Sequence, residues 1–213
     1  MSTATTPVPA PTGRRSVAKP ILWIVLGLAF VSVLIYTDYP LLRPSADPYR
    51  AKVIHDRLLL IPHAIAALLA LALGPFQFSK RFRQRHVQLH RIMGRVYVGA
   101  VAVTAPIALM LGLHGFGRLE AFANSVLSSL WFLCTLCAFL AARNRQIAVH
   151  RQWMTRSYII TLNFIFTRVL NPIPAWFNMS DDTFAMMLLF FSLCYLFFSD
   201  VYFDWRELTH SRA

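Results

Sequence analysis

The chain has 213 residues, of which 57% are hydrophobic and 14% are charged, and its formal net charge is +12. Because an ordinary soluble domain has fewer apolar and more charged residues, this composition argues against one and indicates a membrane protein of a single domain. No alternation of apolar and polar residues with a period of two is sustained, which argues against a transmembrane barrel.

Six apolar runs follow one another along the chain, each about as long as the roughly 20 residues that a helix needs to cross the hydrocarbon of a bilayer. We therefore expect an all-α fold, a six-helix transmembrane bundle that forms one membrane domain over residues 20–205. Residues 1–19, rich in Pro and Thr, predict a disordered N-terminal tail, and residues 206–213 a C-terminal tail. The expected helices cover residues 20–37, 58–78, 92–113, 119–142, 153–170 and 184–202.

The positive charge is unevenly placed between the two faces that these six helices define. Most of the 21 Lys and Arg residues fall in the two tails and in the second and fourth loops with their flanks, whereas acids and bases balance on the other face. Since Lys and Arg accumulate in cytoplasmic loops, we expect the basic face and both termini in the cytoplasm. This placement predicts contact with anionic headgroups of the lipid bilayer and argues against a nucleic-acid partner.

A short pattern recurs at an offset of 60 residues. Arg83-x-Arg85-x4-His90-Arg91 returns as Arg143-x-Arg145-x4-His150-Arg151, each time at a cytoplasmic turn. We expect two repeat hairpins, about 58–113 and 119–170, related by a pseudo-twofold axis along the membrane normal. Helices two to five would then form a pseudo-symmetric four-helix core, with helices one and six at the periphery. Chance similarity is the alternative, because cytoplasmic loops are basic in any case.

The repeat would place His90 and His150 as equivalents on either side of the bundle axis. Two neutral imidazoles on facing helices are one way in which membrane proteins hold a b-type haem, and arginines suit its propionates. The sequence thus offers His90 and His150 as axial ligands, with propionate partners among Arg91, Arg95, Arg151 and Arg156. The alternative needs no cofactor: these side chains cap the bundle and contact lipid phosphates.

A second polar set lies toward the opposite face. Ionisable groups inside membrane helices are costly and usually face the bundle interior, which marks His63 and Arg168 as candidates, with Asn163 nearby. A second haem held by His63 and His114 is one interpretation. In the other, His63 hydrogen-bonds a neighbouring helix after Pro62, and His114 sits in a surface turn.

Three short motifs together resemble one family. They are Leu73-Gly74-Pro75-Phe76-Gln77-Phe78, then His90-Arg91-x2-Gly94-Arg95-x-Tyr97, then His150-Arg151-x-Trp153-Met154-x-Arg156-Ser157. The chain is similar over about residues 55–175 to an uncharacterised bacterial family, domain of unknown function 2306. The resemblance implies a multi-pass protein of the bacterial inner membrane and adds His63 and Gln77 to the residues of interest, but it supplies no reaction.

Two classes of function are compatible with these features. The first is a haem-b-binding electron-transfer or quinol-linked redox protein, with a quinone or another redox protein as partner. The second is a non-enzymatic membrane module, that is, a transporter, an assembly factor or a lipid-binding or anion-binding protein, which uses its basic turns. The sequence alone leaves enzymatic activity undecided.

Overall fold

The computed structural model describes residues 18–39, 56–113, 117–170, 173 and 179–210, and all regular elements among them are helical. The chain order is α1 (Ala18–Val33), a π-helical segment (Leu34–Asp38), α3 (Arg57–Phe78), α4 (Lys80–Arg85), α5 (Val87–Leu113), α6 (Arg118–Arg143), α7 (Ile147–Leu170) and α9 (Asp181–His210). The all-α prediction is confirmed. The expected N-terminal tail and His114 fall outside the described residues.

Each expected helix has a counterpart, but three boundaries differ by five residues or more. Helix α5 begins at Val87 instead of residue 92, and α7 begins at Ile147 instead of residue 153. Helix α9 continues to His210 through residues expected to form a tail. The apolar runs mark only the hydrocarbon-facing part of each helix, whereas these helices continue into polar segments whose backbone hydrogen bonds are made within the helix.

In the part of the chain that the structure describes, four helices are long and apolar enough to cross a membrane: α3, α5, α6 and the stretch Asp182–Trp205 of α9. The apolar stretch of α1, Trp23–Tyr36, is shorter. Helix α7 carries three arginines and is therefore more polar than the other long helices. The protein is thus a membrane protein with several apolar helices, and crossing by α1 and α7 remains a prediction.

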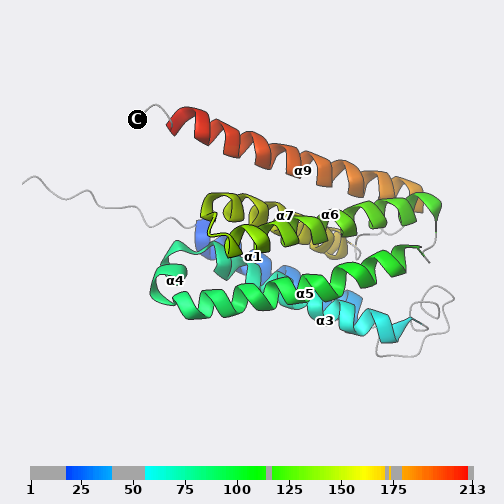
Figure 1. The fold of residues 1–213 in the computed structure, drawn as a ribbon. Helices are drawn as coiled ribbons and strands as arrows, with labels where there is room; N and C mark the ends of the chain where they lie inside the picture. The colour runs from blue at the N-terminus through cyan, green and yellow to red at the C-terminus, as the bar shows by residue number, and fades with distance from the viewer. Residues whose placement is uncertain (1–17, 40–55, 114–116, 171–172, 174–178, 211–213) are drawn as a thin grey trace, which may run out of the picture.

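The long helices lie side by side, roughly along one direction (Figure 1). Helix α3 packs against α5, α5 against α6, α6 against α7, and α7 returns to α3. This closes a ring in which α5 and α7 lie across from each other. Helix α9 packs on α6 and α7, and α1 packs on α7 and α3. Helix α4 and the turn between α6 and α7 are at the same end of the ring.

The Gly74-Pro75 step fixes how α3 meets α7. A proline has no N–H, so Pro75 leaves the carbonyl of Leu71, four residues earlier, without its helical donor. The hydroxyl of Tyr158 donates to that carbonyl at 3.1 Å. An added Cβ on Gly74 would overlap the Tyr158 ring. The glycine therefore admits the tyrosine, and the tyrosine satisfies the carbonyl that the proline exposes.

Candidate functional site at the basic end of the bundle

A layer of hydroxyl groups crosses the middle of the ring. Tyr97 of α5 is fully buried, and its hydroxyl lies 2.8 Å from Oγ of Ser157 and 3.2 Å from Oγ1 of Thr161, both on α7. Ser157 lies 2.7 Å from Thr135 of α6, whose hydroxyl donates to the carbonyl of Trp131. Each hydroxyl can donate to the next, and the last one donates to a backbone carbonyl. No hydroxyl of the layer is therefore left without a hydrogen bond.

His90 and His150 lie about two helical turns from this layer, toward the end that carries α4. Each is the fourth residue of its helix. His90 precedes Tyr97 by seven residues and His150 precedes Ser157 by seven, a spacing that returns to the same helix face. Because Tyr97 and Ser157 meet across the ring, both histidines lie on inward-facing sides of α5 and α7.

The two imidazoles differ in their hydrogen bonding. Nδ1 of His150 lies 2.8 Å from the carbonyl oxygen of Ala138 on α6, to which it can only donate. That bond fixes the ring and leaves Nε2 as the nitrogen with a free lone pair. Nδ1 of His90 is buried and has no partner. His150, Arg83 and Arg91 are near enough to act electrostatically on His90.

Gln77 of α3 packs against α5 near Gly94. It is 8% exposed, and its amide nitrogen, Nε2, is buried without a partner. Its Oε1 would stand 3.3 Å from a Cβ placed on Gly94, one helical turn beyond His90 on α5. Gln77 and His90 thus each have one buried nitrogen without a partner among the described residues. Buried polar atoms are nearly always paired, so each of these nitrogens is a donor or acceptor that a ligand or a water could meet.

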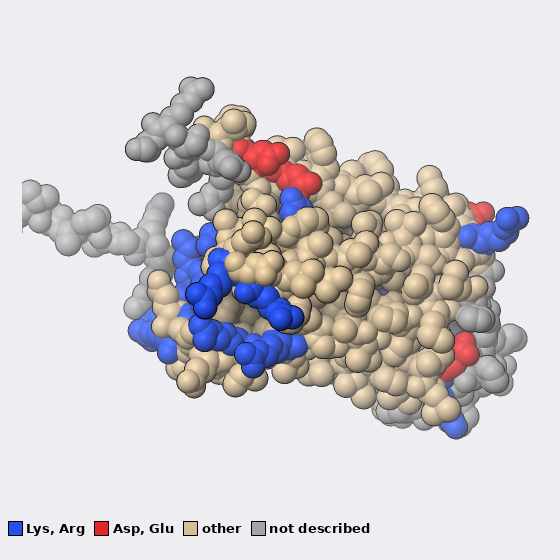
Figure 2. Space-filling view, viewed as in Figure 1, with Lys and Arg blue, Asp and Glu red and all other residues tan. Residues whose placement is uncertain are grey.

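Cations surround this end of the bundle. Figure 2 shows Lys and Arg gathered there around a hollow in the surface, whereas the opposite end carries few charges. We call this end the basic end. Arg91, Arg95 and Arg151 are exposed there. Its cations on described residues are Lys80, Arg81, Arg83, Arg85, Arg91, Arg95, Arg143, Arg145, Arg151 and Arg156.

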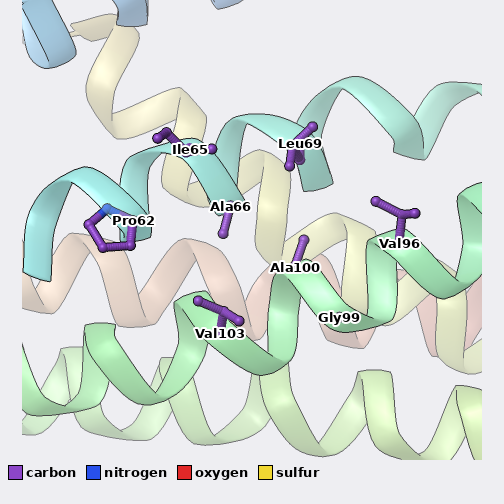
Figure 3. Close-up of a pocket in the computed structure, with 8 residues that line it drawn as sticks. All are labelled: Pro62, Ile65, Ala66, Leu69, Val96, Gly99, Ala100 and Val103. Atoms are coloured by element: carbon purple, nitrogen blue, oxygen red, sulfur yellow. The ribbon is translucent and has the colours of Figure 1, made fainter.

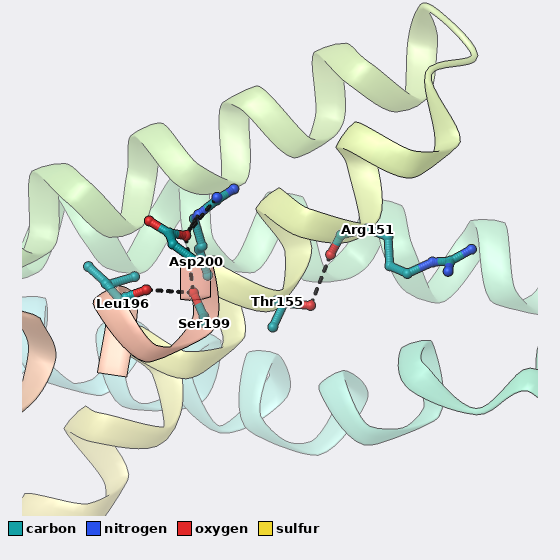
Figure 4. A network of polar contacts seen from close by, with 6 residues as sticks. Arg151, Thr155, Leu196, Ser199 and Asp200 are labelled. Atoms are coloured by element: carbon teal, nitrogen blue, oxygen red, sulfur yellow. Dashed lines mark hydrogen bonds and ion pairs between the residues drawn. The ribbon is translucent and has the colours of Figure 1, made fainter. Parts of the chain in front are cut away.

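Arg156 is engaged with α9. Its Nη2 lies 2.7 Å and its Nε 2.8 Å from Oδ1 of Asp200, and its guanidinium stacks 4.7 Å from the ring centre of Trp153. Figure 4 shows Asp200 beside Ser199, with Arg151 directed away from them. Of the four arginines considered for propionates, Arg156 is thus the one held by a carboxylate in the described part of the chain.

His63 lies in the other half of the membrane domain and is satisfied by a neighbouring helix. Its Nδ1 is 2.7 Å from the hydroxyl and 3.1 Å from the carbonyl oxygen of Thr104 on α5. The expected hydrogen bond to a neighbour is confirmed. Arg168 is exposed, although its charge acts on His63. Among the described residues no group of three or more His, Cys, Asp or Glu side chains is arranged to hold a metal ion.

Asn163 faces α9 and not the interior of the ring. Its amide nitrogen donates to Oγ of Ser192 at 2.6 Å, while its Oδ1 is buried without a partner. Asn163 and Arg168 are therefore not brought together with His90, His150 and Gln77. The first role of Asn163 is to join α7 to α9.

Sequence reasoning missed the hydroxyl layer and the Tyr158 contact. Thr135 and Thr161 are ordinary residues within apolar helices, so no local pattern distinguishes them. Tyr97 and Ser157 are separated by 60 residues, which is the repeat offset. That offset was the one available signal.

Comparison with known proteins agrees with this picture of a helical membrane protein. No curated protein matches the chain, and no solved structure matches it. The model of a family described as a predicted membrane protein, DUF2306, matches residues 60–197, which include α5, α6, α7 and most of α3. The match covers well over half of the chain, and the chain therefore belongs to the DUF2306 family of membrane proteins.

Proposed function

We propose that the basic end holds a b-type haem between His90 and His150 and that the protein transfers electrons at the inner membrane. The observation that carries the proposal is the bond from Nδ1 of His150 to the carbonyl of Ala138. Histidines that ligate a metal commonly donate their other ring nitrogen to a backbone carbonyl, which sets the tautomer and the ring direction. His150 is arranged in this way, with Nε2 available as ligand.

The position of His90 supports the same site. It lies across the ring from His150, on the same α5 face as Tyr97, and its buried nitrogen lacks a partner. Two histidines from facing helices are a standard axial pair for a low-spin haem. The 60-residue offset between these histidines and between Tyr97 and Ser157 supports the pseudo-symmetric reading of the four-helix core.

The charge of the basic end suits a haem. Arg91, Arg95 and Arg151 are exposed at the same end and suit carboxylates. A bound haem would supply a one-electron iron couple. His90 and His150 would hold it, and Arg91, Arg95 and Arg151 would pair with its carboxylates. A quinol or a redox protein would be the electron partner.

The test is the absorption spectrum of the protein purified in detergent from haem-replete cells. We expect a Soret band that shifts on reduction with dithionite, and its loss in His90→Ala and His150→Ala. The matched control is His86→Ala, because His86 is exposed in the same basic segment and should leave the spectrum unchanged. A colourless wild-type preparation would overturn the proposal.

A second function is favoured by one specific observation, the buried donor of Gln77 beside exposed arginines. A donor without a partner in a basic hollow suits an acceptor anion, as in a transporter, an assembly factor or an anion-binding module. Isothermal titration with inorganic phosphate should then show binding that Arg91→Gln and Arg151→Gln weaken. Binding that both substitutions leave unchanged would exclude this function.

We also infer that α1 and α7 cross the bilayer and that the basic end faces the bacterial cytoplasm, with both termini on that side. Support comes from the gathering of cations at one end, since positive loops stay on the cytoplasmic side. Reporter fusions within α4 and within the turn between α6 and α7 should both report a cytoplasmic location. Opposite locations for the two would refute the topology.

A further inference from the structure

An open apolar groove runs along the outer side of α3 and α5 (Figure 3). It has a volume of about 580 Å³ and is almost entirely apolar. The residues that shape it are Pro62, Ala66 and Leu69 of α3 and Val96, Gly99 and Val103 of α5. From Val96 to Val103 the helix rises by roughly 10 Å.

Small residues create the groove. Ala66 and Ala100 are buried and form its floor, while Val96 and Val103 are exposed and form one wall. Gly99 lies between these valines, and nothing lies within 4 Å of the position that its Cβ would occupy. The helices approach closely at the alanines, so the space above Gly99 stays open to the hydrocarbon.

Charge marks one end of the groove. Arg95 precedes Gly99 by one helical turn and Arg91 by two, on the same side of α5. Both side chains are exposed, and no carboxylate of the described residues pairs with either. Long arginine side chains in this position extend their guanidinium groups toward the headgroup region while their stems remain in apolar surroundings. One end of the apolar groove is therefore followed along α5 by two cations.

We propose that this groove is a specific site for an anionic phospholipid, with one acyl chain along Gly99 and the phosphate bound by Arg95 and Arg91. Lipid tails are as apolar as the protein surface, so burial alone gives no preference for this position. Shape at Gly99 and charge at Arg95 supply the selectivity. The site shares Arg91 and Arg95 with the proposed haem site, but Gly99 and the other groove residues lie outside that site, so Gly99→Leu tests the lipid site by itself.

The experiment uses native mass spectrometry of the full chain in detergent, with added phosphatidylglycerol or phosphatidylcholine of identical acyl chains. Wild type should retain one phosphatidylglycerol under conditions that strip phosphatidylcholine. Gly99→Leu fills the groove and should abolish retention. Gly27→Leu on α1 is the matched control, since its added Cβ also meets nothing within 4 Å, and it should retain the lipid.

A charge variant tests the headgroup contact. Arg95→Gln should weaken phosphatidylglycerol binding by about fivefold, the effect of one cation near an anionic headgroup. Equal retention of the two lipids would overturn the proposal, as would undiminished retention by Gly99→Leu. Release of a quinone or of a second protein copy, in place of a phospholipid, would also overturn it. Unchanged thermal unfolding of both leucine variants shows that these outcomes do not arise from misfolding.

Discussion

In the middle of the bundle the buried hydroxyls of Tyr97, Ser157 and Thr135 are hydrogen-bonded to one another, whereas Nδ1 of His90 and Nε2 of Gln77, nearer the basic end, have no partner among the described residues. A buried polar group that is paired holds helices together, and one that is unpaired costs stability. Nε1 of Trp131 in the middle is also unpaired among the described residues, so the contrast rests on the hydroxyls, which serve packing, and on the two nitrogens nearer the basic end, whose cost a ligand would offset.

The largest effect is expected where the middle is most tightly packed. Gly74→Ala should lower the free energy of unfolding by about 3 kcal/mol, because the new methyl group overlaps Tyr158, whose hydroxyl is bound to Leu71. Thermal unfolding in detergent measures this. The control is Gly99→Ala, which meets nothing and should raise stability by up to about 1 kcal/mol. If the two variants had the same free energy of unfolding, the contact of Gly74 with Tyr158 would contribute nothing to stability.

A smaller loss is expected for the paired histidine. His63→Ala removes both contacts with Thr104 and leaves the threonine hydroxyl with one acceptor, the carbonyl of residue 63. We expect destabilisation of about 1–3 kcal/mol, with any haem spectrum unchanged. Loss of the chromophore without loss of stability would instead assign His63 to the ligand site.

Tyr97→Phe should cost less than either of these. Ser157 keeps its contact with Thr135, and Thr161 keeps its bond to the carbonyl of Ser157, so no partner is orphaned. We expect a loss of about 1 kcal/mol by thermal or denaturant unfolding. A loss several times larger would mean that the layer acts as one cooperative network and not as separate bonds.

The smallest effect on stability is expected at the basic end. Gln77→Leu keeps similar volume and removes an unpartnered buried donor, so the free energy of unfolding of the ligand-free protein should stay the same or rise by up to about 1 kcal/mol. Ligand binding at the basic end should weaken in the same variant. A marked loss of stability would place Gln77 with the packed middle and remove the contrast between the two regions.

The sequence predicted the helices better than their contacts. Apolar runs located each long helix, because hydropathy is a local property. They missed the true starts at Val87 and Ile147, since a helix does not end where its residues become polar. The motif around Gly74 and Pro75 was visible in the sequence. Its structural role depends on a contact with Tyr158, which follows more than eighty positions later.

The candidate site was predicted in part. His90 and His150 were chosen from their repeat, and the structure places them on the facing helices α5 and α7. The bond that directs His150 runs to a backbone carbonyl, which carries no trace in the residue sequence. Arg156 could not be assigned beforehand, because its partner Asp200 lies on α9 and is brought close only by the packing of that helix.

We propose that the basic end is a ligand site in which His90 binds the ligand and does not hold the fold together. The most direct measurement is the ratio of haem to protein chain in purified samples, taken beside thermal unfolding of the haem-free protein. We expect about one haem per wild-type chain and none in His90→Ala or His150→Ala. We also expect haem-free His90→Ala to unfold at the same temperature as haem-free wild type. Wild-type protein without haem, or a His90→Ala variant that retains it, would contradict the account.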